Sequence, residues 1–380
     1  MERIEGGNLS LEDFPVTNKF ILNQNHDNVC VPFEKIPGQV ENPVHVQKTS
    51  GSTGTPFAVL QDTRKRNRRI AELKYYNAEV GVKSHEMIGQ CRIWTKWQSK
   101  SKWQSFKENI VPINVSRMDD ETCAYLFSVV KEKKIVLIRA YASWYDALVK
   151  YMEEGKGNPE DLKSLRVCLS SSEALNEETR VKMQKLAGIP IVEAYADEEA
   201  GVIAQQRIGD TNYYLNHSGY VFEFLKLDED IPAEEGELAR IVITDLFNYA
   251  FPLIRYDTGD TAIWRNGNKA SHGWIYISNL YGRRLDLVYN TAGVPVHPMN
   301  FARILKNLPG IIQWQFVQKG KKDYLVRLNL EQGSDVGNTI MEIKNVLGMD
   351  ADISVEFVDD IPILASGKRK PVICEWEKSN

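Results

Sequence analysis

The sequence predicts an α/β protein with a large N-terminal domain built on a parallel sheet and a small C-terminal α+β domain. Its 380 residues are enough for about two or three structural units. Apolar runs typical of buried strands alternate with helical segments between residues 135 and 195. After Gly282 this alternation gives way to a shorter mixture of strands and helices.

The alternating segments imply a parallel sheet with helices on its faces. The expected strands are 135–140, 165–169 and 189–195, and the expected helices are 143–154 and 176–186. Asn176 suits the N-cap of the second helix, and Gly188 suits its end. Ligands of such sheets bind in the loops beyond the carboxyl ends of the strands.

The C-terminal part predicts a separate α+β unit of about 100 residues, a size at which a domain folds by itself. Its expected elements are a hairpin over 285–296 around Ala292-Gly293, helices at 298–307 and 336–347, and strands at 311–318, 324–330 and 353–358. We place the domain boundary at Gly282–Arg283, which divides the chain into residues 1–282 and 283–380.

Composition excludes several classes of protein. The hydrophobic fraction of 43% and charged fraction of 26% are typical of globular proteins, and the net charge of -4 gives no reason to expect a nucleic-acid partner. The five cysteines are scattered without a Cys-x-x-Cys pair, which argues against structural zinc and fits a reducing compartment. We see neither a signal peptide nor a membrane span, and we expect a cytoplasmic protein.

The sharpest local motif is Thr-Ser-Gly-Ser-Thr-Gly-Thr-Pro at residues 49–56. Its glycines allow positive φ and a close backbone approach, while hydroxyl and amide groups can surround phosphate oxygens. It is not the phosphate loop of P-loop proteins, because no lysine follows Gly54. Taken alone, the motif is also compatible with a polar turn between two strands.

Two acidic motifs follow along the chain. Asp197, Glu198 and Glu199 come directly after an expected strand, where carboxylates could hold Mg²⁺ against a triphosphate. They could equally offset the dipole in the first turn of a helix. Asp260 ends the run Thr-Gly-Asp, where it could accept hydrogen bonds from two ribose hydroxyls or simply cap a turn.

Two basic motifs complete the set. In Gly282-Arg283-Arg284 an arginine could pair with phosphate or ribose, or the pair could be solvated. In Ser366-Gly367-Lys368 the lysine could be exposed, or could reach an active site as a mobile cation.

The order and spacing of these five motifs resemble the adenylate-forming superfamily, which comprises acyl-CoA synthetases, luciferases and the adenylation domains of peptide synthetases. Ser-Ser-Glu-Ala-Leu at residues 171–175, the loop at 49–56 and the short C-terminal part look most like phenylacetate–CoA ligase and the CapK-type capsular polysaccharide proteins. The resemblance runs from about Lys48 to about Val372, nearly the whole chain.

The resemblance implies an ATP- and Mg²⁺-dependent ligase that converts a carboxylic acid into an acyl-adenylate and releases pyrophosphate. The acceptor stays open among CoA, a carrier-protein thiol, an amine and a sugar. The residues that would surround the ATP phosphates are Ser50, Gly51, Ser52, Thr53 and Gly54.

The remaining roles are likewise implied by the resemblance. Tyr195 would lie against adenine, and Glu199 would be the metal-binding catalytic carboxylate. Asp260 would bind ribose, and Arg283, on the hinge side, would lie near ribose and phosphate. Lys368 would contact the reacting carboxylate and the α-phosphate.

The chain also departs from the superfamily pattern. The usual Tyr-Gly-x-Thr/Ser-Glu reads Tyr-Ala-Asp-Glu-Glu at 195–199, and Leu285 occupies the hinge position where relatives commonly carry Asp or Lys. Glu198 adds a negative charge near the triphosphate, and the segment before residue 49 is short. These departures keep open an alternative, a catalytically degenerate relative that binds nucleotide or an acyl group as a sensor or scaffold.

Two further stretches carry secondary expectations. The aromatic and basic residues of 94–106 could stack on single-stranded nucleic acid, but we expect Trp94, Trp97 and Trp103 to pack on the sheet or line the acid pocket. The basic run 64–69 is expected to be the exposed face of a helix, with contact to CoA phosphates as the alternative. His217 could face the acid pocket, although nothing local requires it.

Overall fold

The structure of the chain is a computed structural model. The described residues are 9–38, 45–48, 57–92, 94, 101–117, 119–173, 175–269, 271–283, 287–296, 299–306, 308–330, 336–361 and 371–376.

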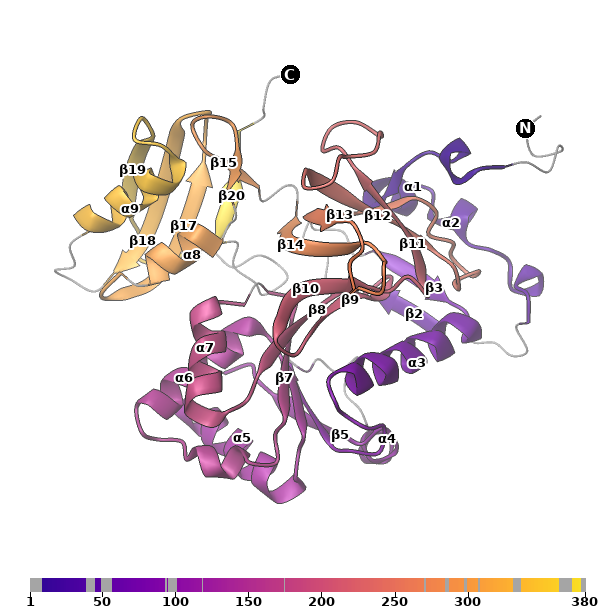
Figure 1. Cartoon of the computed structure of the whole chain (residues 1–380), viewed down its shortest axis with the longest axis horizontal. Coiled ribbons are helices and arrows are strands. Elements are labelled where there is room, and N and C mark those ends of the chain that lie inside the picture. Colours follow the sequence, from indigo (N-terminus) through magenta and orange to yellow (C-terminus); the bar gives the residue numbers. More distant parts are fainter. Residues whose placement is uncertain are drawn as a thin grey trace.

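A twelve-stranded sheet forms the larger part of the molecule (Figure 1). Its strands follow the order β11-β12-β13-β14-β10-β9-β8-β7-β6-β4-β5, with β1 beside β13. The parallel half consists of β4 (Ile88–Arg92), β5 (Ile110–Asn114), β6 (Leu137–Ala140), β7 (Val167–Ser171) and β8 (Ile191–Asp197).

The other half of the sheet is antiparallel apart from the pairing of β1 with β13. It consists of β1 (Thr17–Asn18), β9 (Gly201–Arg207), β10 (Asp210–Leu215), β11 (Tyr220–Leu225), β12 (Leu238–Asp245), β13 (Tyr256–Arg265) and β14 (Tyr276–Arg283). The predicted α/β class is confirmed, but the sheet is mixed rather than parallel throughout. Strands β8 to β10 are joined by tight turns, which cannot hold the helical crossover that parallel neighbours need.

Helices cover both faces of the parallel half (Figure 1). Helices α5, α6 and α7 lie on one face, and α3 lies on the other. The helices of this half are α3 (Thr63–Glu79), α4 (Lys102–Glu108), α5 (Asp120–Lys133), α6 (Ala142–Glu153), η3 (Pro159–Leu162) and α7 (Glu177–Ala187). The expected caps of α7 are confirmed, because the Asn176 side chain accepts a hydrogen bond from the Glu178 amide and Gly188 is left-handed at φ 69°.

Short elements at the N-terminus lie against the antiparallel half. They are η1 (Leu11–Asp13), α1 (Lys19–Gln24), α2 (His26–Val29), η2 (Phe33–Lys35), β2 (His45–Lys48) and β3 (Ala58–Gln61). The Thr17 amide donates to the Arg255 carbonyl at 2.8 Å, which fixes the start of α1 beside β13. Strands β2 and β3 pair with each other and flank the motif at 49–56.

The C-terminal part has its own sheet, in the order β19-β18-β17-β20. Its elements are β15 (Val288–Tyr289), β16 (Pro295–Val296), α8 (Met299–Lys306), β17 (Ile311–Gln318), β18 (Asp323–Leu330), α9 (Gly337–Leu347), β19 (Asp352–Phe357) and β20 (Val372–Cys374). Its buried core includes Phe301 stacked on Phe316, with ring centroids 3.9 Å apart. Every expected element is present, and β20 is an addition. The exact boundary at Gly282–Arg283 stays a prediction.

Two secondary expectations are wrong in part. Trp103 and Phe106 on α4 are 70% and 80% exposed, so Trp103 neither packs on the sheet nor lines a pocket, while Trp97 lies outside the described residues. Trp94 donates to the Ile113 carbonyl of β5 at 3.0 Å, as expected of a packed side chain. Within the basic run, Lys65 is buried and lies 2.5 Å from Asp245, because this side of α3 faces the antiparallel strands.

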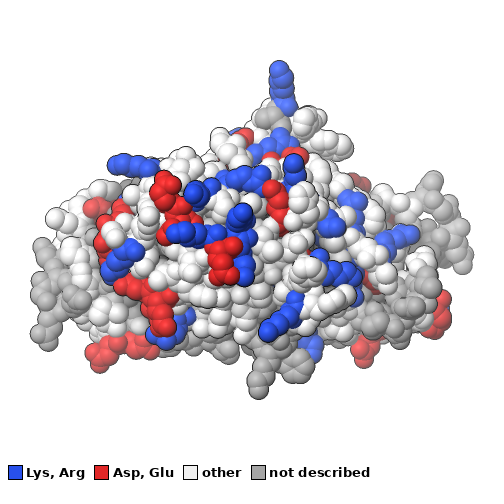
Figure 2. Space-filling view, turned by 90° about the horizontal axis from the view of Figure 1, so that it is seen from below, with Lys and Arg blue, Asp and Glu red and all other residues white. Residues whose placement is uncertain are grey.

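The surface offers no clear nucleic-acid footprint on the face seen in Figure 2. Basic and acidic side chains lie among one another over much of that face, whereas a nucleic-acid site needs a basic patch or stripe. Within the described part of the chain, no helix is both long and apolar enough to cross a bilayer.

Candidate nucleotide and acid site

The candidate site forms where the curvature of the sheet brings β13 close to β8. The Tyr195 hydroxyl on β8 donates to Asp260 Oδ2 on β13 at 2.9 Å and lies 3.1 Å from Thr258 Oγ1. On the neighbouring strand β14, Arg283 is the register partner of Asp260. Three residues named from separate motifs therefore lie together.

Asp260 lies within strand β13 and not on a loop, so the expectation of a loop aspartate is wrong. The local bend is made by Gly259, at φ 81°, whose amide donates to Asp257 Oδ1 at 2.8 Å. Because Asp257 satisfies the bend, the Asp260 carboxylate is not needed as a turn cap. It is held instead by the Tyr195 hydroxyl.

The acidic run forms the turn of a β-hairpin between β8 and β9, which rules out the first turn of a helix. Three successive carbonyls of this turn accept hydrogen bonds from side chains of three other elements. The Glu198 carbonyl accepts from Arg69 at 2.8 Å, the Glu199 carbonyl from Gln61 at 3.2 Å, and the Ala200 carbonyl from Tyr220 at 2.6 Å. These contacts fix the backbone from which the Glu199 side chain projects.

Glu199 fits the part of a single metal-binding carboxylate. It is only 8% exposed, and its Oε1 accepts a hydrogen bond from the Tyr256 hydroxyl at 2.7 Å, which orients the group. Among the described residues, no three His, Cys, Asp or Glu side chains are arranged to hold a metal ion. Nucleotide-bound Mg²⁺ needs only one or two carboxylates besides phosphate oxygens and water, so a single carboxylate meets that need.

Carboxyl groups are concentrated at this site. Burial raises the pKa of Asp260 to about 6, although the Tyr195 hydrogen bond and the charge of Arg283 lower it. Burial also raises the pKa of Asp197 well above its usual range, and the charges of Glu199 and Asp260 raise it further. Such a cluster favours the binding of cations.

Lys19 is a site residue that the sequence reasoning missed. The pairing of β1 with β13 places it one residue beyond Asn18, the register partner of Asp257. Its Nζ lies 6.0 Å from the ring centroid of Phe57, the first described residue after the motif at 49–56. Burial lowers the pKa of Lys19, while the charges of Glu199 and Asp197 raise it. No motif in the sequence marks this lysine.

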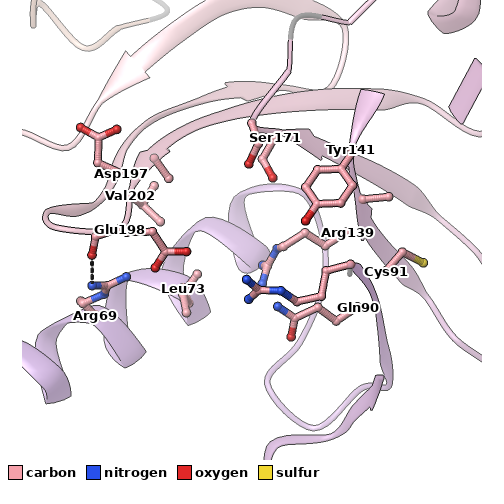
Figure 3. A pocket seen from close by; sticks show the side chains of 15 residues that line it. Arg69, Leu73, Gln90, Cys91, Arg139, Tyr141, Ser171, Asp197, Glu198 and Val202 are labelled. Atoms are coloured by element: carbon pink, nitrogen blue, oxygen red, sulfur yellow. Dashed lines mark hydrogen bonds between the residues drawn. The ribbon is translucent and has the colours of Figure 1, made fainter. Parts of the chain in front are cut away.

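A cavity of about 230 Å³ adjoins the acidic turn (Figure 3). It lies at the carboxyl ends of β4, β6, β7 and β8, under α3. Its lining residues are Arg69, Leu73, Gln90, Cys91, Arg92, Arg139, Ala140, Tyr141, Ser171, Ser172, Ala196, Asp197, Glu198, Gly201 and Val202. His217 lines a different cavity of about 610 Å³, where it stacks on Trp274 at 4.7 Å, so it does not face this one.

Several predicted residues lie outside the described residues. They are Ser50, Gly51, Ser52, Thr53, Gly54, Leu285 and Lys368. Their roles stay predictions. Of the predicted site residues that the structure describes, all four lie around one place: Tyr195, Glu199, Asp260 and Arg283.

Comparison with solved structures decides the fold. A 2-hydroxyisobutyryl-CoA ligase in the postadenylation state, in complex with R3-HIB-AMP, superimposes with a TM-score of 0.71 at 16% identity, covering 95% of this chain and 80% of that one. ATP-bound MatB from Rhodopseudomonas palustris superimposes with a TM-score of 0.62 at 14% identity, covering 86% and 66%. The fold is that of the adenylate-forming CoA ligases.

Sequence comparisons agree with the adenylate-forming fold. Residues 288–375 match the CapK C-terminal domain. Protein CapK of Staphylococcus aureus is 24% identical over 97% of this chain and 83% of its own length. Phenylacetate-coenzyme A ligase of Thermus thermophilus is 22% identical over 80% of this chain and 68% of its own length. The resemblance expected from the motifs is confirmed.

Proposed function

We propose that the protein is a ligase that uses ATP and Mg²⁺ to convert a carboxylic acid into its acyl-adenylate, with release of pyrophosphate, and then transfers the acyl group to a thiol such as CoA. The observation that carries the proposal is the meeting of Tyr195, Glu199, Asp260 and Arg283 beside a cavity large enough for a small acid. The adenylate-forming fold supports it.

Asp260 would accept the ribose hydroxyls, and Arg283 beside it would lie near ribose and phosphate. Tyr195 has a second role, because its hydroxyl holds the Asp260 carboxylate. Tyr195 is only 7% exposed, so little of its surface is open to adenine. Glu199, oriented by Tyr256, would hold Mg²⁺, which would offset the charge of the triphosphate.

A carboxylate that attacks the α-phosphate is an anion approaching an anion, so the site must supply positive charge. Lys19 interacts electrostatically with Glu199 and Asp197. Lys368 would bring a second cation from the C-terminal domain, which we take to begin at Arg283 and to rotate between adenylation and thiol transfer. We do not favour the degenerate alternative, because Tyr195, Glu199, Asp260 and Arg283 lie around one place and the solved structures that share the fold are CoA ligases.

The test is acid-dependent exchange of labelled pyrophosphate into ATP, measured for wild type and Lys368→Ala. We expect exchange with wild type and a loss of about 100-fold or more in the variant, with ATP affinity little changed, because the lysine acts mainly in the transition state. Lys319→Ala removes an exposed lysine from the same domain and should exchange like wild type. Absence of exchange with every acid tried would refute the proposed ligase.

A further inference from the structure

Three arginines line the cavity that we assign to the acid. Arg139 on β6 is the register partner of Gln90 on the adjacent strand β4, about 4.8 Å away. Arg92 lies two residues beyond Gln90, so it leaves the sheet on the same face. Arg69 reaches the cavity from α3, which covers that face.

Each of these guanidinium groups has only neutral partners among the described residues. Arg139 Nη2 donates to Asn77 Oδ1 at 3.0 Å, and Arg69 donates to the Glu198 carbonyl at 2.8 Å. Arg92 stacks near Trp94, with its Cζ 5.6 Å from the ring centroid, and its buried Nε has no hydrogen-bond partner within the described part of the chain.

Other half-buried or buried arginines of this protein pair with a carboxylate. Arg180 lies 2.8 Å from Glu193, Arg240 lies 2.9 Å from Asp257, and Arg255 lies 2.8 Å from Glu223. A buried cation is costly unless a carboxylate compensates it, and in these places one does. At Arg139 burial lowers the pKa, with no carboxylate among the causes that oppose it. Around Arg139 and Arg92 the cavity therefore lacks an anion, which a ligand can supply.

The cavity is polarised along its length (Figure 3). Asp197 and Glu198 lie at one end, while Arg139, Gln90 and Tyr141 lie at the other. The Asp197 end adjoins the nucleotide residues, because Asp197 lies two residues after Tyr195 on β8 and the Tyr195 hydroxyl donates to Asp260. The reacting carboxylate must lie at that end to meet the α-phosphate, which leaves the arginine end for the rest of the acid.

We propose that the acid substrate is a small molecule that carries a second oxyanion, a carboxylate or a phosphate, bound by Arg139 and Arg92. The inference rests on the proposed function, because it takes this cavity as the acid site. Guanidinium groups bind both oxyanions through paired, charge-assisted hydrogen bonds. A volume of about 230 Å³ suits a compact acid rather than a long acyl chain.

The test compares acids that differ only in the second group. Pyrophosphate exchange is measured with succinate against succinamate, glutarate against glutaramate, and 3-phosphoglycerate against glycerate. We expect the dianionic member of at least one pair to have the higher kcat/KM by about 10-fold to 100-fold. The first two pairs report on a carboxylate and the third on a phosphate.

Variants then locate the preference. Arg139→Gln and Arg92→Gln should each abolish the preference for the dianionic acid and raise the KM for that acid. Neither substitution should change the KM for ATP. Arg139→Lys should retain part of the preference for the dianionic acid. Arg166→Gln, which removes an exposed arginine paired with Glu86, should behave like wild type. Thermal melts show whether each variant is folded, and the Arg92 variant serves if the Arg139 variant is not.

The outcomes separate this inference from the proposed function. If the acids with a neutral second group support exchange equally well or better, the second oxyanion is refuted and the proposed ligase is unaffected. A rise in the KM for ATP alone would also overturn it, since the arginines would then bind nucleotide. Calorimetric binding of dianions that is lost in Arg139→Gln, without exchange, would support the anion site and refute the ligase.

Discussion

At the scale of single residues, the site depends on carboxylates whose burial in the folded protein costs free energy. Asp260 is partly buried among β8, β13 and β14, and the hydrogen bond from Tyr195 does not offset the effect of this burial on its pKa. Its ionised form is the one that can accept two ribose hydroxyls. A residue kept in this state at a cost to stability is typical of a binding site.

The pKa of about 6 predicts how ATP binding depends on pH. ATP affinity should be constant above about pH 7 and fall below pH 6, as Asp260 takes up a proton. Asp260→Asn should weaken ATP binding by about 10-fold and remove that pH dependence. Calorimetric titrations at pH 5.5 and 7.5 measure both effects, and an unchanged affinity in the variant would reduce Asp260 to a structural residue.

The same substitution should stabilise the protein at neutral pH. Because the folded-state pKa is raised, the folded protein binds a proton more tightly than the unfolded chain does. The stability contributed by protonated Asp260 is complete below its unfolded pKa and is lost as the pH rises through about 6. Asp260→Asn should therefore increase the free energy of unfolding at pH 7.5 by about 1 kcal/mol or more, measured by urea denaturation.

Adjacent acids Glu198 and Glu199 should behave differently towards Mg²⁺. Glu199 is buried and oriented by Tyr256, whereas Glu198 is exposed. Glu199→Gln should raise the Mg²⁺ concentration for half-maximal adenylation by about 10-fold, since it removes a charged ligand. Glu198→Thr should leave the Mg²⁺ requirement unchanged. The reverse pattern would show that the metal assignment is wrong by one residue.

Some of these site residues could be identified from the sequence and others could not. Tyr195, Glu199, Asp260 and Arg283 lie in motifs whose order carries the resemblance, although the contacts between them join strands far apart in the chain. Lys19 has no motif, and only the β1–β13 pairing places it. Arg139 did leave a signal, as a charged residue inside the apolar run Ile-Val-Leu-Ile-Arg-Ala, but that run was interpreted only as a buried strand.

At the scale of elements, side chains of other elements support the β8–β9 hairpin turn in addition to its own strand pairing. Tyr220 on β11 is central to this support, because its hydroxyl donates to the Ala200 carbonyl at 2.6 Å and accepts from Lys65 at 3.0 Å. Lys65 in turn pairs with Asp245 on β12. Helix α3 and strands β11 and β12 are thereby connected to the turn that carries Glu199.

Tyr220→Phe should therefore affect both stability and the site. Loss of two buried hydrogen bonds should lower the free energy of unfolding by about 1 to 3 kcal/mol and raise the Mg²⁺ requirement for adenylation. Tyr249→Phe, at a half-exposed tyrosine, is the control and should change stability by less than about 0.5 kcal/mol. Equal stability of the two variants in urea denaturation would contradict the proposed support of the turn.

The elements differ in how well local sequence predicted them. Strands and helices between residues 135 and 195, and between 311 and 358, were expected because each has its own apolar pattern, and α7 also has its caps. The antiparallel strands β9 to β14 were not, since their pairing joins segments through tight turns and long-range contacts. Thr-Gly-Asp was expected on a loop, but pairing with β12 and β14 extends it as a strand.

At the scale of the whole molecule, the curl of one sheet brings the ends of its two halves together. The parallel half supplies the acid cavity, and the antiparallel half supplies Asp260 and Arg283. Figure 1 shows the C-terminal elements as a separate body with its own sheet. Lys368, which we propose to act in adenylation, belongs to the C-terminal part of the sequence, so adenylation would need both parts of the chain.

The central claim is that a carboxylate oxygen of the acid attacks the α-phosphate of ATP. It is tested with the acid that gives the fastest exchange, labelled with ¹⁸O in its carboxylate, with ATP and with hydroxylamine as the acceptor. We expect AMP to carry one ¹⁸O atom, because the bridging oxygen stays on phosphorus when the acceptor attacks the carbonyl carbon. Mass spectrometry of the nucleotide reads this directly. Unlabelled AMP, or ¹⁸O in inorganic phosphate with ADP as the product, would contradict it.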